Sequence, residues 1–85
     1  MGLRVEYEPR ATKELHWLPE ADTLRVYRRI VAYAADPGLT AHDVVPLRAT
    51  LDGYRLRVGD WRVIFRLSAG TMYVRRVVHR REAYR

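Results

Sequence analysis

The segment from Tyr54 to Arg62, with sequence YRLRVGDWR, constrains the fold of this chain more than any other. Glycine tolerates the positive φ angle of a tight turn, so Gly59 and Asp60 predict a β-hairpin with a two-residue turn. Such a turn fixes the register, and in this register apolar residues face one another across the two strands. The three apolar pairs are Val58 with Trp61, Leu56 with Val63, and Tyr54 with Phe65.

Arginines occupy the other face of this hairpin. The same register places Arg57 directly opposite Arg62, with Arg55 on the same face. Like charges directly opposite one another destabilise a sheet, so this pair indicates a bound anion. Phosphate is the obvious candidate, because the planar guanidinium group binds phosphate through two parallel hydrogen bonds.

The basic charge of the chain is confined to its C-terminal part. Residues 1–53 contain seven Lys or Arg against eight Asp or Glu, whereas residues 54–85 contain nine Arg against two acids. The net charges of these parts, −1 and +7, account for the whole excess of +6. This asymmetry favours a polyanionic partner, either nucleic acid or an acidic protein segment. The alternative is a solvated basic surface.

Length and composition predict one small domain, residues 1–85, without a cofactor. The chain has no cysteine, its three histidines are dispersed, and no Gly-rich loop is present to hold a nucleotide, so we expect no metal site and no cofactor. It has neither a signal peptide nor an apolar run long enough to cross a membrane, and we therefore expect a cytoplasmic protein.

Hydrophobic periodicity predicts an α+β fold of order β-α-α-β-β-β. Alternation at Leu3, Val5 and Tyr7 indicates a strand, and a first helix follows from Pro9 to about Leu18. A second helix is expected from an N-cap at Asp22 to Asp36, with an apolar stripe. The stripe consists of Leu24, Tyr27, Ile30, Val31 and Ala34.

The remaining chain is predicted to be a loop over 39–46 and then an antiparallel meander. Its strands are Tyr54 to Val58, Trp61 to Leu67 and roughly Thr71 to Val78, with both helices on the apolar sheet face. The second turn, at 68–70, could hold two to four residues. Because a slip of one residue exchanges the faces of a strand, the sequence does not assign Arg75 or Arg76 to either face.

The C-terminal run from His79 to Arg85 supplies further candidate site residues. RNA cleavage without a metal requires a base for the 2′-hydroxyl, cations that stabilise the phosphorane and an acid for the leaving oxygen. Arg62 and Arg80 are candidate charge stabilisers, and the acid/base candidates are His79, Tyr84 and Glu82. Tyr84 could instead pack on the sheet, and Glu82 could simply pair with an arginine.

These segments resemble the RelE/ParE toxin superfamily, and more closely its RelE-like branch. The resemblance rests on Pro46-Leu47, on the run from Leu51 to Phe65, and on His79-Arg80 and Tyr84-Arg85. It implies a ribosome-dependent endoribonuclease that cleaves mRNA in the ribosomal A site. It also implies a hetero-oligomer with a small cognate antitoxin that keeps the toxin inactive.

The resemblance carries family roles onto matching positions of this chain. Charge-stabilising positions fall on Arg62 and Arg80, and a C-terminal tyrosine falls on Tyr84. The substrate-binding candidates for phosphate and RNA are Arg55, Arg57 and Arg81. Well-studied relatives have lysines on the Tyr54–Val58 strand, and arginine, unlike lysine, does not lose its proton. The base is therefore expected to be Tyr84, whose ionised form nearby arginines favour, or His79, or a group outside the protein.

Two other functions remain compatible with the sequence. The ParE branch shares this fold but inhibits DNA gyrase through protein contacts, so its arginines need not form a reaction centre. A catalytically silent module that binds RNA or an antitoxin is the other possibility. The interleaved aromatic residues Tyr54, Trp61, Tyr73 and Tyr84 could stack on bases or belong to the core.

Overall fold

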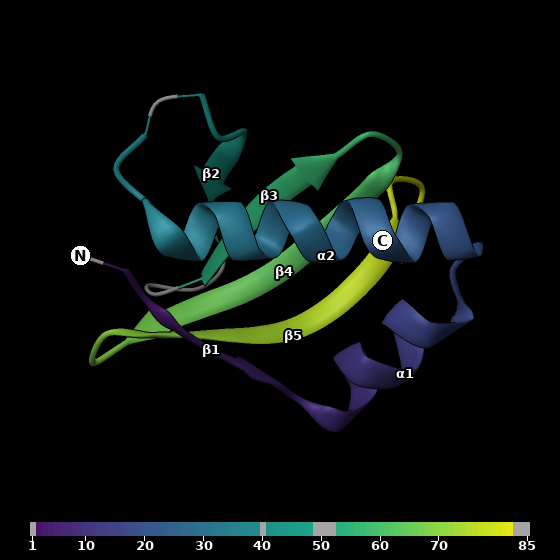
Figure 1. Ribbon diagram of the computed structural model, residues 1–85, viewed down its shortest axis with the longest axis horizontal. Helices are drawn as coiled ribbons and strands as arrows, with labels where there is room; N and C mark the ends of the chain where they lie inside the picture. Colours follow the sequence, from purple (N-terminus) through teal and green to yellow (C-terminus); the bar gives the residue numbers. More distant parts are fainter. Residues whose placement is uncertain (1, 40, 49–52, 83–85) are drawn as a thin grey trace.

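The computed structural model describes residues 2–39, 41–48 and 53–82, and these form two helices packed on one face of a five-stranded sheet (Figure 1). The helices are α1 (Pro9–Trp17) and α2 (Glu20–Ala35). The strands are β1 (Arg4–Tyr7), β2 (Val44–Pro46), β3 (Gly53–Val58), β4 (Trp61–Ser68) and β5 (Thr71–His79). In the described part of the chain, neither helix is long and apolar enough to cross a membrane.

The sheet has the order β1-β5-β4-β3-β2, with an antiparallel meander at its centre. β1 pairs in parallel with β5 at one edge, so the sheet is mixed. The predicted α+β class, the two helices on one sheet face and the meander are confirmed.

One predicted loop is wrong, because residues 44–46 form the short edge strand β2. Val44 pairs with Leu56, and Pro46 pairs with Tyr54. A strand of three residues is too short to show a hydrophobic period. Proline cannot donate a ladder hydrogen bond, which is tolerated at the edge of a sheet.

The predicted hairpin register is confirmed, including all three apolar pairs and the Arg57–Arg62 pair. Gly59 has the positive φ angle that the turn requires, +58°. The second turn also holds two residues, Ala69 and Gly70, with φ angles of 50° and 79°. This turn sets Ser68 opposite Thr71 and resolves the turn length that the sequence left open.

A β-bulge in β5 decides which arginines lie on which sheet face. Val74 pairs with Phe65 and Arg76 pairs with Ile64, so Arg75 has no partner on β4. The extra residue reverses the alternation of β5, because each residue of a strand points to the opposite face from its neighbours. Arg76 therefore lies on the same face as Ile64, opposite α2.

Helix α1 matches its predicted bounds, whereas the start of α2 was predicted three residues late. The Pro19 carbonyl accepts backbone hydrogen bonds from Asp22 and Thr23, at 2.8 and 3.0 Å. Pro19 is therefore the N-cap, and no side chain caps this helix. The Asp22 carboxylate lies in the first turn, where its negative charge interacts favourably with the positive end of the helix dipole.

The apolar stripe of α2 was only partly predicted. Ile30 and Ala34 are buried as expected, but Val26 and Tyr33 join them in the core. Leu24, Tyr27 and Val31 are instead 47%, 48% and 44% exposed. The core also contains β-strand residues, namely Leu56, Val58, Val63, Phe65, Met72, Val74 and Val77.

Candidate nucleic-acid interface

The sheet face opposite α2 carries arginines from three adjacent strands. Residues that pair directly across strands share a face, and this rule follows the face from β3 through β4 to β5. The arginines that it assigns to this sheet face are Arg55, Arg57, Arg62, Arg66 and Arg76. We call this set the arginine face.

Arg62 lies on this face but is not open to solvent. Its residue surface is only 7% exposed, and Nη1 donates hydrogen bonds to the carbonyls of Gly59 and Trp61 at 2.8 and 3.0 Å. Nε is buried and makes no hydrogen bond. Alternation along the hairpin predicts that Arg62 points away from the helices into an open groove, and this prediction is wrong, because the guanidinium group bends back to the carbonyls at the turn.

Arg57 and Arg55 extend the arginine face along β3. Arg57 is exposed and pairs with the Asp43 carboxylate, and its backbone N–H donates to the Asp43 carbonyl at 2.9 Å. Arg55 is half-buried beside a hollow of about 580 Å³. The other residues lining this hollow are Val45, Pro46, Leu47 and Arg48.

His79 is not on the arginine face. It pairs with Trp61, and the two rings meet edge to face with their centroids 5.4 Å apart. The preceding residue, Val78, pairs with Arg62 on the arginine face, so alternation directs His79 to the helix side. The structure therefore separates two of the predicted catalytic residues, Arg62 and His79, by the thickness of the sheet.

Arg80 contacts Asp60 of the turn between β3 and β4. The Arg80 backbone N–H donates to the Asp60 carbonyl at 2.7 Å, and its guanidinium Nε lies 3.7 Å from the Asp60 carboxylate. Arg81 is exposed. Tyr84 lies outside the described residues.

Sequence reasoning missed part of the arginine face. The Arg66 guanidinium lies over the Tyr73 ring, 4.1 Å from its centroid, which places this aromatic residue outside the core. Tyr54 instead stacks on Phe65. Arg76 could not be assigned before the bulge was seen, because a bulge has no reliable local sequence signal here.

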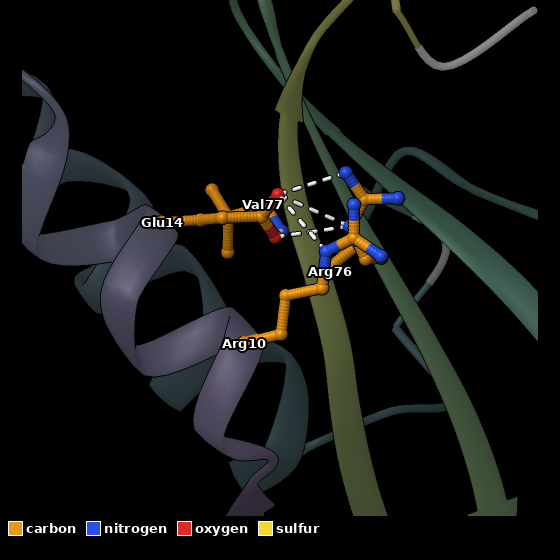
Figure 2. Close-up of polar contacts among 4 residues, drawn as sticks. All are labelled: Arg10, Glu14, Arg76 and Val77. Carbon is orange, nitrogen blue, oxygen red and sulfur yellow. Dashed lines mark hydrogen bonds and ion pairs between the residues drawn. The ribbon is translucent and has the colours of Figure 1, made fainter.

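Helix α1 also contributes to this region through Glu14, as Figure 2 shows. Its carboxylate accepts hydrogen bonds from Arg76 Nε and Nη2 and from the Val77 backbone N–H, at distances of 2.8 to 3.1 Å. The guanidinium of Arg10 faces the same carboxylate at 3.9 Å. The hydrogen bonds that Arg76 donates to Glu14 raise the pKa of Arg76 above its usual value.

The opposite side of the molecule is apolar. Between α1 and α2 lies a groove of about 440 Å³. It is lined by Tyr7, Thr12, Leu15, His16, Glu20, Thr23, Leu24 and Tyr27. Burial raises the pKa of Tyr7 to about 12, with a smaller contribution from Tyr27. We call this groove, together with Val31, the helical face.

No family model matches the chain, and neither does any curated protein. Several solved structures do match the chain. The RelE–RelB complex from Pyrococcus horikoshii matches at 28% identity, with a TM-score of 0.79 over 96% of this chain and 99% of that one. The RelBE2 toxin–antitoxin complex from Mycobacterium tuberculosis matches at 26% identity, with a TM-score of 0.66 over 93% and 99%.

A more distant match, the DinJ–YafQ toxin–antitoxin complex from E. coli, shares the fold at 13% identity, with a TM-score of 0.76 over all of both chains. The two RelE matches above 25% identity each span more than nine tenths of both chains. The chain is thus similar to RelE-like toxins both in fold and in sequence.

Proposed function

We propose that this protein is the toxin of a type II toxin–antitoxin pair and that it cleaves mRNA on the ribosome. The observation that carries the proposal is the arginine face, above all the direct pairing of Arg57 with Arg62. Asp43 offsets the charge of Arg57 only in part, because the arginines of this face outnumber its acids, and a bound phosphate would accept from the donors that remain. Such a surface suits the backbone of RNA, and activity on ribosomes places the toxin in the cytoplasm.

The proposed reaction is an attack by the 2′-hydroxyl of RNA on the adjacent phosphorus. A base removes the hydroxyl proton, the new P–O bond forms, and the bond to the 5′-oxygen breaks as that oxygen takes up a proton. Arg62 and Arg80 stabilise the charge that develops on the phosphorane. Arg55, Arg57 and Arg81 bind the flanking phosphates.

We assign the base to Tyr84 in preference to His79. The His79 ring lies on the helix side of the sheet against Trp61, whereas the phosphate would lie on the arginine face. In the sequence Tyr84 lies among arginines, and guanidinium groups close to a tyrosine would favour its ionised form. Arginine itself is excluded as the base because it does not lose its proton in proteins.

The proposed partner is a cognate antitoxin, as in the toxin–antitoxin complexes that share this fold. The helical face supports this proposal, because Leu24, Tyr27 and Val31 are each more than two-fifths exposed beside an apolar groove. Exposed apolar patches of this kind mark protein interaction sites. Arg25 and Arg28 flank the patch and suit an antitoxin helix with acidic residues beside its apolar ridge.

The test is a brief induction of the toxin, followed by mapping of mRNA 5′ ends and a DNA gyrase cleavage assay. New 5′ ends at in-frame codon positions are expected. Arg80→Ala and Tyr84→Phe should each slow cleavage by about 100-fold or more, whereas Arg28→Ala, on the helical side, should not change it. Trapped DNA breaks with intact mRNA would overturn the proposal in favour of gyrase inhibition.

A further inference from the structure

The β-bulge creates a second group of arginines at the edge of the arginine face. Beyond the end of β1, a hollow of about 300 Å³ lies between the start of α1 and the bulge. It is lined by Glu8, Arg10, Ile64, Arg75 and Arg76. The lining thus consists of three guanidinium groups, one carboxylate and the aliphatic side chain of Ile64.

The guanidinium groups of Arg10 and Arg75 are only loosely engaged. Arg10 approaches Glu14 at 3.9 Å and Arg75 approaches Glu8 at 3.6 Å, distances too long for hydrogen bonds. The two side chains are 68% and 51% exposed. Their donors are therefore accessible to an anion, and guanidinium groups form their strongest hydrogen bonds with carboxylates and phosphates.

Arg76 is held differently, because Glu14 fixes its orientation (Figure 2). The carboxylate accepts from Nε at 3.1 Å and from Nη2 at 2.8 Å. Among the described residues, none accepts a hydrogen bond from Nη1 of Arg76. Glu14 thus orients the guanidinium group and leaves one of its nitrogens for a ligand.

This hollow is continuous with the arginine face. Ile64 pairs directly with Arg55 on one side and with Arg76 on the other. Neighbouring strands lie about 4.8 Å apart, so Arg55 and Arg76 are separated by only about 10 Å across the sheet. An extended polyanion that contacts Arg55 can therefore reach the hollow.

We propose that this hollow is a second phosphate site, in which Arg10, Arg75 and Arg76 bind a backbone phosphodiester of RNA outside the cleavage centre. Glu14 is a positioning residue that orients Arg76. The inference rests on the proposed function only in taking RNA as the ligand. The site holds the strand in register on the arginine face and takes no part in proton transfer.

The test measures binding at several salt concentrations, with a short single-stranded RNA and with ribosomes as separate probes. The Arg10→Ala/Arg75→Ala variant is compared with Arg28→Ala/Arg29→Ala, which removes the same charge from α2. Each lost phosphate contact should reduce the slope of log K against log salt by about 0.7. Affinity at low salt should fall about tenfold for the first variant only.

The outcomes separate this inference from the nuclease proposal. A reduced slope with the short RNA places the bound phosphate in the mRNA, and a reduction seen only with ribosomes places it in ribosomal RNA. Slopes equal to those of the control variant, with mRNA cleavage intact, overturn the second site and leave the proposed function standing. RNA binding with the expected slope change but without cleavage overturns the nuclease and retains the site.

Discussion

The two faces of this small domain differ in the kind of partner that each can bind. The arginine face gathers like charges, whose attraction for a polyanion acts over a distance and weakens with salt. The helical face exposes Leu24, Tyr27 and Val31, whose contribution to binding comes from apolar area removed from water. The fold thus places the surface for a charged ligand and the surface for an apolar ligand on different sides of the molecule.

Helix α2 illustrates how an exposed apolar surface arises beside the core. Val26 and Ile30 on α2 face the sheet and are fully buried, whereas Leu24 and Tyr27 face outward. A single helix therefore has one apolar side for the core and another for a partner. An antitoxin bound to the outer side need not cover the arginine face, so the two binding functions are separable by substitution.

The largest expected effect comes from placing charge on the helical face. The Leu24→Asp/Tyr27→Asp variant should weaken antitoxin binding by about 100-fold or more, because two central apolar contacts each contribute roughly 2 kcal/mol or more. Its mRNA cleavage should remain unchanged. Both residues are about half exposed, so the core is not disturbed. Titration calorimetry with the antitoxin and a ribosomal cleavage assay measure the two functions.

Val45→Asp is the matched control on the other side of the molecule. Val45 is 37% exposed on β2 and pairs directly with Arg55, so its charge should weaken RNA binding and spare the antitoxin. The comparison of the two faces would fail if both variants impaired the same function.

Local turn chemistry explains why much of the site could be predicted. A two-residue turn with glycine at positive φ permits only one register, so the Arg57–Arg62 pair followed directly from Gly59 and Asp60. The burial of the Arg62 side chain could not be predicted from the turn. Its contacts are with backbone carbonyls of the turn, and periodicity carries no information about where a long side chain bends.

The other misses depend on long-range packing. The sequence of α2 offers two apolar sides, and only the crossing of the helix over the sheet selects Val26 and Tyr33 for the core. The bulge at Arg75 arises where β5 continues past the end of β1 and meets α1. Neither the buried side of α2 nor the position of the bulge can be predicted from the residues nearest to it in the sequence.

A smaller effect is expected at Glu14, which fastens α1 to the edge of β5 and so joins the two layers. Glu14→Gln keeps the shape and one acceptor for Val77, but it removes the charge that binds Arg76. The side chain of Glu14 is 19% exposed, so the free energy of unfolding should fall by about 1 to 2 kcal/mol. Urea denaturation measures this loss.

Arg10→Ala provides the control, because its contact with Glu14 is long and its side chain is 68% exposed. Surface pairs of this kind contribute at most about 1 kcal/mol. Equal losses for Glu14→Gln and Arg10→Ala would show that the Glu14–Arg76 contact does not fasten the helix to the sheet.

A different kind of effect, a dependence of stability on pH, is expected at the helical face. Burial raises the pKa of Tyr7 to about 12 from an ordinary value of 10.0, so the unfolded chain ionises first as pH rises. The contribution of the neutral phenol to stability is therefore complete below about pH 10 and is lost between about pH 10 and 12. Tyr7→Phe should show a shallower decline of the urea midpoint over this interval. Equal declines would mean that the groove leaves Tyr7 as hydrated as in the unfolded chain, and the apolar character of the helical face would then rest on Leu24, Tyr27 and Val31 alone.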